Sequence, residues 1–283
     1  MELLKSALFG IVEGITEWLP ISSTGHMILL ENFMKLNVTE EFWDMFLVVI
    51  QLGAILAVIL LFWNKLWPFG KKNNKIPIKE SGVLSWFKKD SWIMWLKIIV
   101  ACLPAIIMVV LGLDEKFDSW FYNAPSVAIA LIVFGIGFLI VEKINSGRNP
   151  KVTSISEISY KTAFAIGLFQ LLAAMFPGTS RSGATILGAL LIGVSRDVAA
   201  EFTFFLAVPV MLGASLLKIV KFGFAFTSSE LAILLVGMFV AFAVSIIVIK
   251  FLMSYIKKHD FKVFGWYRIV LGIIVLIYFF LVR

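Results

Sequence analysis

Apolar residues along this chain form long runs that are separated by short polar segments. A run of about 20 apolar residues is long enough to cross a bilayer as a helix, and six runs meet that requirement. These runs are residues 42–63, 93–112, 124–141, 198–219, 230–253 and 265–282. The pattern therefore predicts an all-α polytopic membrane protein with six transmembrane helices.

Two further apolar runs, 3–35 and 161–195, are each interrupted by a polar turn. The interruptions lie at Pro20–Gly25 and Pro177–Gly183. Each arm has about 10 to 17 residues, which is too short to cross a hydrocarbon core roughly 30 Å thick. Paired short arms around a polar turn predict two re-entrant helical hairpins, whose turns must be satisfied by protein or by a water-filled cavity.

Composition agrees with a membrane protein and excludes a soluble one. Of 283 residues, 60% are hydrophobic and 15% are charged, and the mean hydropathy is +0.98. No segment is polar enough to form a separate soluble domain, so residues 1–283 are expected to form one integral membrane domain. The net charge of +7 lies mostly in loops beside the spans, where it indicates membrane orientation and no nucleic-acid partner.

Charge in the loops predicts the orientation. Seven lysines lie in 64–92 and three in 254–264, whereas 113–123 carries three acids against one lysine. Basic loops face the cytoplasm, so we expect the acidic loop and both termini to be external. The first hairpin then enters from outside and the second from the cytoplasm.

The opposed hairpins agree with an internal repeat of residues 1–142 and 143–283. Gly10 lies ten residues before Pro20 and "ISSTG", and Gly167 lies ten before Pro177 and "GTSRSG". Each half contains one hairpin and three spans, and an odd number of crossings inverts the second copy. Inverted repeats of broken helices place a site near the midplane. In this alignment Glu13 pairs with Gln170, Glu17 with Ala174, and Thr24 approximately with Arg181; the halves have therefore diverged chemically.

Polar residues gather at both hairpin turns. Glu13 and Glu17, at i and i+4, share one helix face, and Gly10 and Gly14 allow close packing on an adjacent face. Ionisable residues inside a membrane are costly and default to functional roles. The first turn adds Ser22, Ser23, Thr24 and His26, and the second supplies Thr179, Ser180, Arg181, Ser182 and Thr185.

Together these groups describe a phosphoryl site. Two carboxylates suit a divalent cation, and arginine suits a phosphate group. The sequences "SSTG" and "TSRSG" each open a short helix, whose free N–H groups favour an anion. Because the site lies inside the membrane, the phosphate should be carried on a lipid. A shared site requires the Glu17 carboxylate and the Arg181 guanidinium to lie close together.

The stretches "EGITEWLPISSTGHM" (13–27) and "PGTSRSGATI" (177–186) resemble the two signature motifs of the undecaprenyl pyrophosphate phosphatase family, also called bacitracin-resistance protein BacA. "VVIQLGAILAV" (48–58) and the overall length also match, so the resemblance covers essentially the whole chain. It implies hydrolysis of undecaprenyl pyrophosphate at the outer face of a bacterial inner or cell membrane. The expected products are undecaprenyl phosphate, recycled for peptidoglycan synthesis, and inorganic phosphate. A divalent cation, Mg²⁺ or Ca²⁺, is the implied cofactor.

Carried over by position, the family's glutamates fall on Glu13 and Glu17, and its candidate nucleophile falls on Ser23. Its histidine falls on His26 and its arginine on Arg181. We expect Glu13 and Glu17 to bind the metal, with Glu17 also catalytic, and five hydroxyls to bind substrate: Ser22, Thr24, Ser180, Ser182 and Thr185.

Two departures from the family pattern limit this transfer. Leu47 stands where the family often has an acid, so no metal ligand comes from that position. The spacing from Gln170 to Pro177 is also one residue longer, which leaves Gln170 outside the expected catalytic set.

Alternatives stay open at this point. Either Ser23 attacks the phosphate, with His26 as base or proton shuttle, or a metal-activated water attacks and Ser23 only positions the substrate. A polyprenyl-phosphate transporter would share the architecture. A phosphatidic-acid-phosphatase-type enzyme is disfavoured because Leu187 occupies the place of its second histidine. Gly and Ala on several spans permit a homodimer without specifying one.

Overall fold

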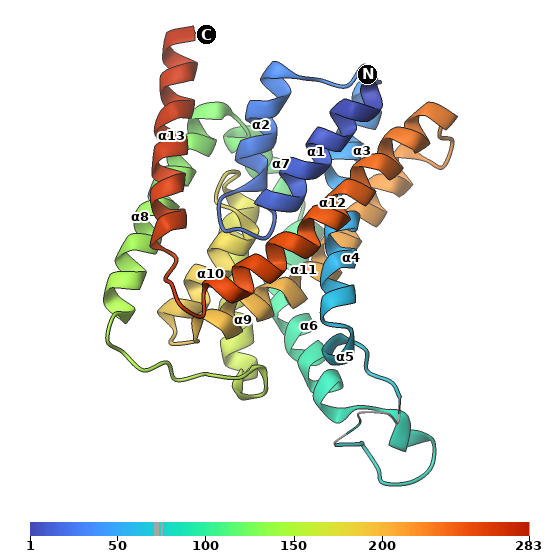
Figure 1. Ribbon diagram of the computed structural model, residues 1–283, viewed down its shortest axis with the longest axis vertical. Helices are drawn as coiled ribbons and strands as arrows, with labels where there is room; N and C mark the ends of the chain where they lie inside the picture. The colour runs from blue at the N-terminus through green and yellow to red at the C-terminus, as the bar shows by residue number, and fades with distance from the viewer. Residues whose placement is uncertain (71–73, 75, 283) are drawn as a thin grey trace.

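The computed structural model describes residues 1–70, 74 and 76–282, and that part of the chain is built from helices with no strand of a sheet (Figure 1). Of the seven lysines in 64–92 from which the orientation was predicted, Lys71, Lys72 and Lys75 lie outside the described residues. The α-helices are α1 Glu2–Thr16, α2 Ser23–Phe33, α3 Glu40–Val49, α4 Gln51–Leu61, α5 Trp63–Leu66, α6 Lys89–Val110, α7 Leu113–Phe121, α8 Ala124–Asn145, α9 Tyr160–Met175, α10 Arg181–Leu191, α11 Arg196–Phe222, α12 Ser228–Tyr255 and α13 Lys262–Val282. Two short 3₁₀ helices, Val83–Trp86 and Ile155–Glu157, lie in the loops.

The six predicted spans are confirmed within the described residues. Six helical segments have the length and apolar composition to cross a membrane: Glu40–Leu61, Lys89–Val110, Ala124–Asn145, Arg196–Phe222, Ser228–Tyr255 and Lys262–Leu281. The first of these consists of α3 and α4, which meet at Ile50, where Gly53 N–H donates to the Ile50 carbonyl in a tighter turn. Many large apolar side chains on these helices point outward, as expected for a multi-pass membrane protein whose solvent is lipid.

Both broken runs form helical hairpins. α1 and α2 are joined by residues 17–22, and α9 and α10 by residues 176–180. The interruptions are therefore placed slightly earlier than the predicted Pro20–Gly25 and Pro177–Gly183, because a serine caps each second helix and lets it begin before the glycine. How deeply these hairpins enter a membrane stays a prediction.

The acidic loop contains a helix that was not predicted. α7 lies within the segment 113–123, where only an acidic loop was expected. Two of its aromatic rings, Phe117 and Phe121, pack edge-on against Phe176, which directly follows α9 in the second hairpin. This packing stabilises the helix. α7 therefore rests on the turn that precedes α10.

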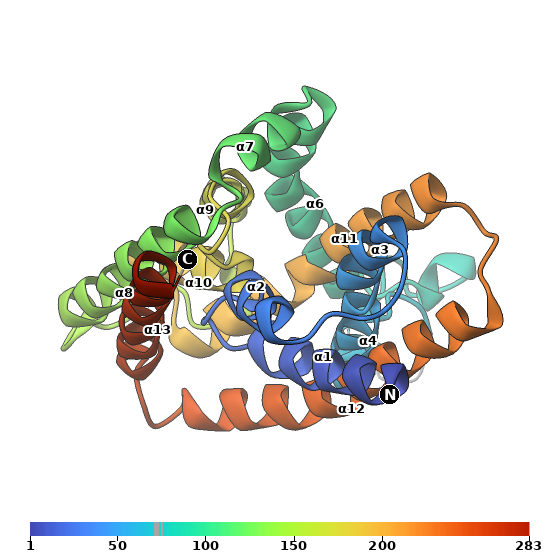
Figure 2. The same ribbon diagram turned by 90° about the horizontal axis from the view of Figure 1, so that it is seen from above.

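The first helix of each hairpin packs against a span from the other half of the chain. α1 lies along α12, and α9 lies along α6, whereas α8 and α13 pack against each other (Figure 2). Glycine permits both close crossings, since a Cβ at Gly10 would lie 2.5 Å from the Gly237 carbonyl oxygen and one at Gly167 would lie 2.3 Å from that of Ala101. The predicted repeat makes α6 and α12 equivalent, so reciprocal crossings agree with it, although its boundary at 142/143 stays a prediction.

Candidate active site

The two hairpin turns end in the same unusual serine conformation. Ser22 and Ser180 have φ values of 75° and 68°, and they are the non-glycine residues with positive φ in the described chain. The hydroxyl oxygen of each accepts a hydrogen bond from the backbone N–H three residues later, at Gly25 and Gly183. Residues in such strained backbone conformations are typical of functional sites. Here each serine is the N-cap of a helix, so the first backbone N–H groups of α2 and α10 follow directly after it.

These caps correct the expected alignment of the repeat. Because Ser22 and Ser180 are equivalent caps, Ser23 is the counterpart of Arg181. The sequence alignment had paired Arg181 with Thr24, one residue too far. The interval from Gly10 to Ser22 is one residue shorter than that from Gly167 to Ser180, and the turns absorb the difference.

An ion pair joins the two hairpins. Arg181 Nη2 donates to Glu17 Oε1 at 2.7 Å, and both side chains are largely buried. The Ser182 hydroxyl also donates to the backbone carbonyl of Glu17 at 3.0 Å. The structure therefore brings together the acid and the arginine that the sequence placed in one site.

Ser23 lies against the same carboxylate. Its Oγ donates to Glu17 Oε2 at 2.9 Å, so one carboxylate holds both the arginine and the candidate nucleophile. His26 makes other contacts: Nδ1 lies 2.7 Å from the Ser22 carbonyl oxygen, and Nε2 lies 2.6 Å from the Tyr267 hydroxyl. The structure thus pairs the Ser23 hydroxyl with Glu17 and not with His26, although His26 had been expected to act as its base or proton shuttle.

Glu13 is buried with an unsatisfied oxygen. Its side chain is 1% exposed, and Oε1 has no hydrogen-bond partner among the described residues. Its carboxyl lies close enough to Glu17 and Arg181 to interact electrostatically with both. Gln170, which the sequence left outside the site, is also buried, and its amide nitrogen and oxygen have no hydrogen-bond partner in the part of the chain that the structure describes.

The donor set fits a divalent cation that is shared with a substrate. No group of three or more His, Cys, Asp or Glu side chains gathers in the described part of the chain, so a complete protein cage is absent there. Magnesium, however, typically binds one or two carboxylates together with phosphate oxygens. The unsatisfied oxygen of Glu13, one helical turn from Glu17, is where such an ion would be held.

Most of the expected substrate-binding hydroxyls already have protein partners. The hydroxyl oxygens of Ser180 and Ser182 lie 3.1 Å apart in a hydrogen bond. The Thr185 hydroxyl donates to the Arg181 carbonyl oxygen and accepts from the Thr203 hydroxyl. Ser22, as a cap, is fully buried. These hydroxyls shape the turns, whereas Thr24 has no side-chain hydrogen bond among the described residues. Direct contact of any of them with substrate stays a prediction.

A family model described as bacitracin resistance protein BacA matches residues 6–274. The chain belongs to the BacA family. It is 62% identical to undecaprenyl-diphosphatase 1 of Clostridium acetobutylicum over 282 residues, covering 100% of this chain and 99% of that protein. It is also 62% identical to the undecaprenyl-diphosphatase of Desulfitobacterium hafniense, covering 99% and 96%, and 58% identical to that of Acetivibrio thermocellus, covering all of both chains.

Within this BacA-family chain, the sequence reasoning missed two residues of α13. Arg268 is fully buried and donates to Pro20 O at 3.1 Å, Gly178 O at 3.1 Å and Thr179 O at 2.6 Å, so it contacts both turns. Tyr267, beside it, holds His26. The available signal was an arginine inside the apolar run 265–282, since an intramembrane charge indicates function by default.

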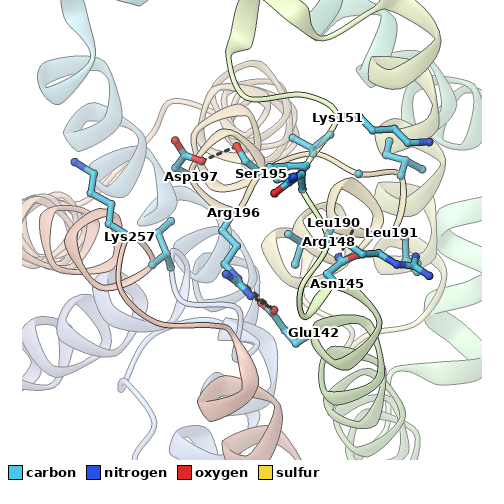
Figure 3. A pocket seen from close by; sticks show the side chains of 16 residues that line it. Glu142, Asn145, Arg148, Lys151, Leu190, Leu191, Ser195, Arg196, Asp197 and Lys257 are labelled. Carbon is cyan, nitrogen blue, oxygen red and sulfur yellow. Dashed lines mark hydrogen bonds and ion pairs between the residues drawn. The ribbon is translucent and has the colours of Figure 1, made fainter.

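A separate cavity of about 450 Å³ is lined by Leu190 and Leu191, at the opposite end of α10 from Arg181. Figure 3 shows the side chains around it. Arg196 and Glu142 pair on one side of it, and Ser195 bonds Asp197. These polar groups satisfy each other. Buried polar atoms of Glu13, Gln170 and Arg181 that have no hydrogen-bond partner among the described residues lie on the hairpins instead, which makes the hairpins the candidate site.

Proposed function

We propose that this protein is an undecaprenyl-diphosphate phosphatase. It hydrolyses undecaprenyl pyrophosphate to undecaprenyl phosphate and inorganic phosphate, which recycles the lipid carrier for peptidoglycan synthesis and confers bacitracin resistance. The observation that carries this proposal is the chain of contacts from Arg181 through Glu17 to Ser23, at the point where two helix N-termini meet. Relatives named undecaprenyl-diphosphatase support it.

The anion is bound by charge and by backbone donors. Nη2 of Arg181 holds Glu17, whereas Nη1 is buried without a hydrogen-bond partner among the described residues and is available for a phosphate oxygen. The first N–H groups of α2 and α10 add further donors. Neutralising the terminal phosphoryl group in this way stabilises charge that develops in the transition state.

Ser23 is the nucleophile in the favoured mechanism. Its proton passes to Glu17 Oε2 as Oγ forms a bond to the terminal phosphorus, and the bond from that phosphorus to the bridging oxygen breaks. The electron pair of the broken bond leaves with undecaprenyl phosphate. Water then attacks the phosphoserine phosphorus, the bond from phosphorus to Ser23 Oγ breaks with release of inorganic phosphate, and Oγ regains the proton from Glu17. In the alternative, water attacks directly and Ser23 only positions the phosphate.

Glu13 and Glu17 would hold a divalent cation, Mg²⁺ or Ca²⁺. When bound, the cation neutralises pyrophosphate oxygens. Glu13 suits this role because its carboxyl is buried, its Oε1 has no hydrogen-bond partner among the described residues, and it lies one helical turn from Glu17, so both carboxylates can face one ion.

The site is proposed to open to the external side of a bacterial cell membrane, with both termini external. The support is the distribution of charge: the basic loops 64–92 and 254–264 are cytoplasmic by the positive-inside tendency. A homodimer stays a prediction.

The decisive experiment measures phosphate release by the purified protein from undecaprenyl pyrophosphate, with and without chelator. We expect metal-dependent release. Normal lipid translocation in vesicles without any release would favour the transporter alternative. Phosphate trapped on Ser23 after acid quench supports serine attack, and full activity of Ser23→Ala would assign the attack to water.

A further inference from the structure

Two consecutive residues of α13 contact the hairpins, although α13 lies at the other end of the sequence. Arg268 is fully buried, and its guanidinium donates to Pro20 O in the first turn and to Gly178 O and Thr179 O in the second. Its planar fork is suited to fixing several acceptors at once, which a lysine cannot do.

Arg268 has no ion pair with a carboxylate among the described residues. A buried charge without such a partner is costly, so the carbonyl groups of the two turns compensate it. Pro20 precedes the cap Ser22 by two residues, and Thr179 directly precedes the cap Ser180. Any movement of either turn away from Arg268 therefore displaces the start of α2 or of α10.

Two contacts hold the His26 ring, one from the Ser22 carbonyl oxygen to Nδ1 and one from the Tyr267 hydroxyl to Nε2. The Ser22 carbonyl can only accept, so the 2.7 Å contact requires the proton of the neutral imidazole to be on Nδ1. Nε2 then accepts from the Tyr267 hydroxyl at 2.6 Å, and the two rings stack at 5.6 Å with an interplanar angle of 7°. Both ring nitrogens are thus held in one tautomer and one orientation.

We propose that Tyr267 and Arg268 are positioning residues of the phosphatase. Arg268 keeps the two helix N-termini at the separation that a pyrophosphate requires, and Tyr267 contacts Nε2 of His26, whose Nδ1–H donates to Ser22, and so holds the ring in one orientation beside the first of them. This role rests on the proposed function, because the two turns carry the backbone N–H groups that bind the phosphate and His26 lies on α2, which begins at the first of them.

The mild variant Tyr267→Phe tests the tyrosine, with Tyr278→Phe as its control. Tyr278 lies on the same helix, and its hydroxyl makes no hydrogen bond among the described residues. The protein has two histidines, so ¹⁵N-histidine labelling resolves His26 from His259. In the wild type we expect a protonated Nδ1 and an unprotonated Nε2 at His26. In Tyr267→Phe the Nε2 signal should move, while the His259 signals stay.

Catalysis provides the second readout. We expect kcat of Tyr267→Phe to fall roughly tenfold or more, with KM changed less than about twofold, since displaced groups slow the chemical step more than binding. Tyr278→Phe should match the wild type. An unchanged His26 spectrum together with unchanged kcat in Tyr267→Phe would overturn the tyrosine's role.

Arg268→Lys tests the clamp, with the exposed Arg148→Lys as control. The lysine keeps the charge but cannot reach carbonyls of both turns, so kcat should fall by about tenfold to a hundredfold. Wild-type kcat in a folded Arg268→Lys protein would overturn the clamp. If the wild type itself releases no phosphate, the proposed function fails, whereas the tautomer of His26 and its dependence on Tyr267 are still measured by NMR.

Discussion

Arg181 and Glu17 form a 2.7 Å ion pair between residues that are not equivalent in the proposed repeat. The structural counterpart of Arg181 in the first hairpin is Ser23, and Ala174 was aligned with Glu17 in the second. The site is therefore asymmetric within a near-symmetric frame: one hairpin provides the acid and the hydroxyl, and the other provides the cation.

Because Glu17 bonds groups from both hairpins, we expect activity to be most sensitive to substitution at this position. Glu17→Gln keeps the size of the side chain, but it removes the acceptor for the Ser23 proton and the charge that holds Arg181. We expect phosphate release to fall by about 10²- to 10⁴-fold, the usual range for a lost general base. Glu40→Gln, at an exposed helix start, should have no effect. A Glu17→Gln protein with activity near that of Glu40→Gln would contradict the role of this pair.

The sequence predicted the helices better than it predicted the hydrogen-bond partners of the site residues. Six spans, two hairpins and a site joining Glu17 to Arg181 follow from apolar runs and from charges inside them. The hydrogen-bond partner of Ser23 could not be predicted from sequence spacing. His26 lies three residues away on the same helix, but its Nε2 contacts Tyr267 on α13, whereas Ser23 bonds Glu17. Contacts across the whole chain decide such pairings. The repeat alignment was one residue off at Arg181, since turns absorb insertions that helices cannot.

Glu13 provides a test of the metal. We expect chelation to abolish phosphate release and added Mg²⁺ or Ca²⁺ to restore it. Glu13→Gln retains a carbonyl oxygen but loses the charge, so the metal concentration for half-maximal activity should rise by roughly tenfold or more, with partial recovery at high metal. A metal titration of both proteins measures this shift. Equal metal dependence in the two proteins would remove Glu13 from the metal site.

Gly167 should be intolerant of a methyl group. Alanine normally stabilises a helix relative to glycine, by up to about 1 kcal/mol. At Gly167, however, the new Cβ would lie 2.3 Å from the Ala101 carbonyl oxygen, so α9 and α6 must separate. We expect Gly167→Ala to lower the free energy of unfolding by about 1–3 kcal/mol, as overpacking does. Gly213→Ala, where the Cβ meets nothing within 4 Å, should be neutral or stabilising. Thermal unfolding in detergent compares the two.

Glu142 should matter for stability and not for chemistry. Its carboxylate is fully buried and accepts from Arg196 Nε at 2.9 Å (Figure 3). It also accepts from the Phe261 N–H at 3.0 Å, at the far end of α10 from Arg181. Glu142→Gln keeps an acceptor for Phe261 but leaves Arg196 without its anion.

Because Arg196 is partly exposed, it can turn toward solvent, so the expected cost is about 1–3 kcal/mol and not the larger loss typical of a fully buried pair. The surface pair of Lys262 and Asp260 is the comparison, since Asp260→Asn should cost under about 1 kcal/mol. Below its unfolding temperature, the Glu142→Gln protein should keep the wild-type kcat. A loss of kcat at full folding would instead connect this end of the molecule to the hairpin turns.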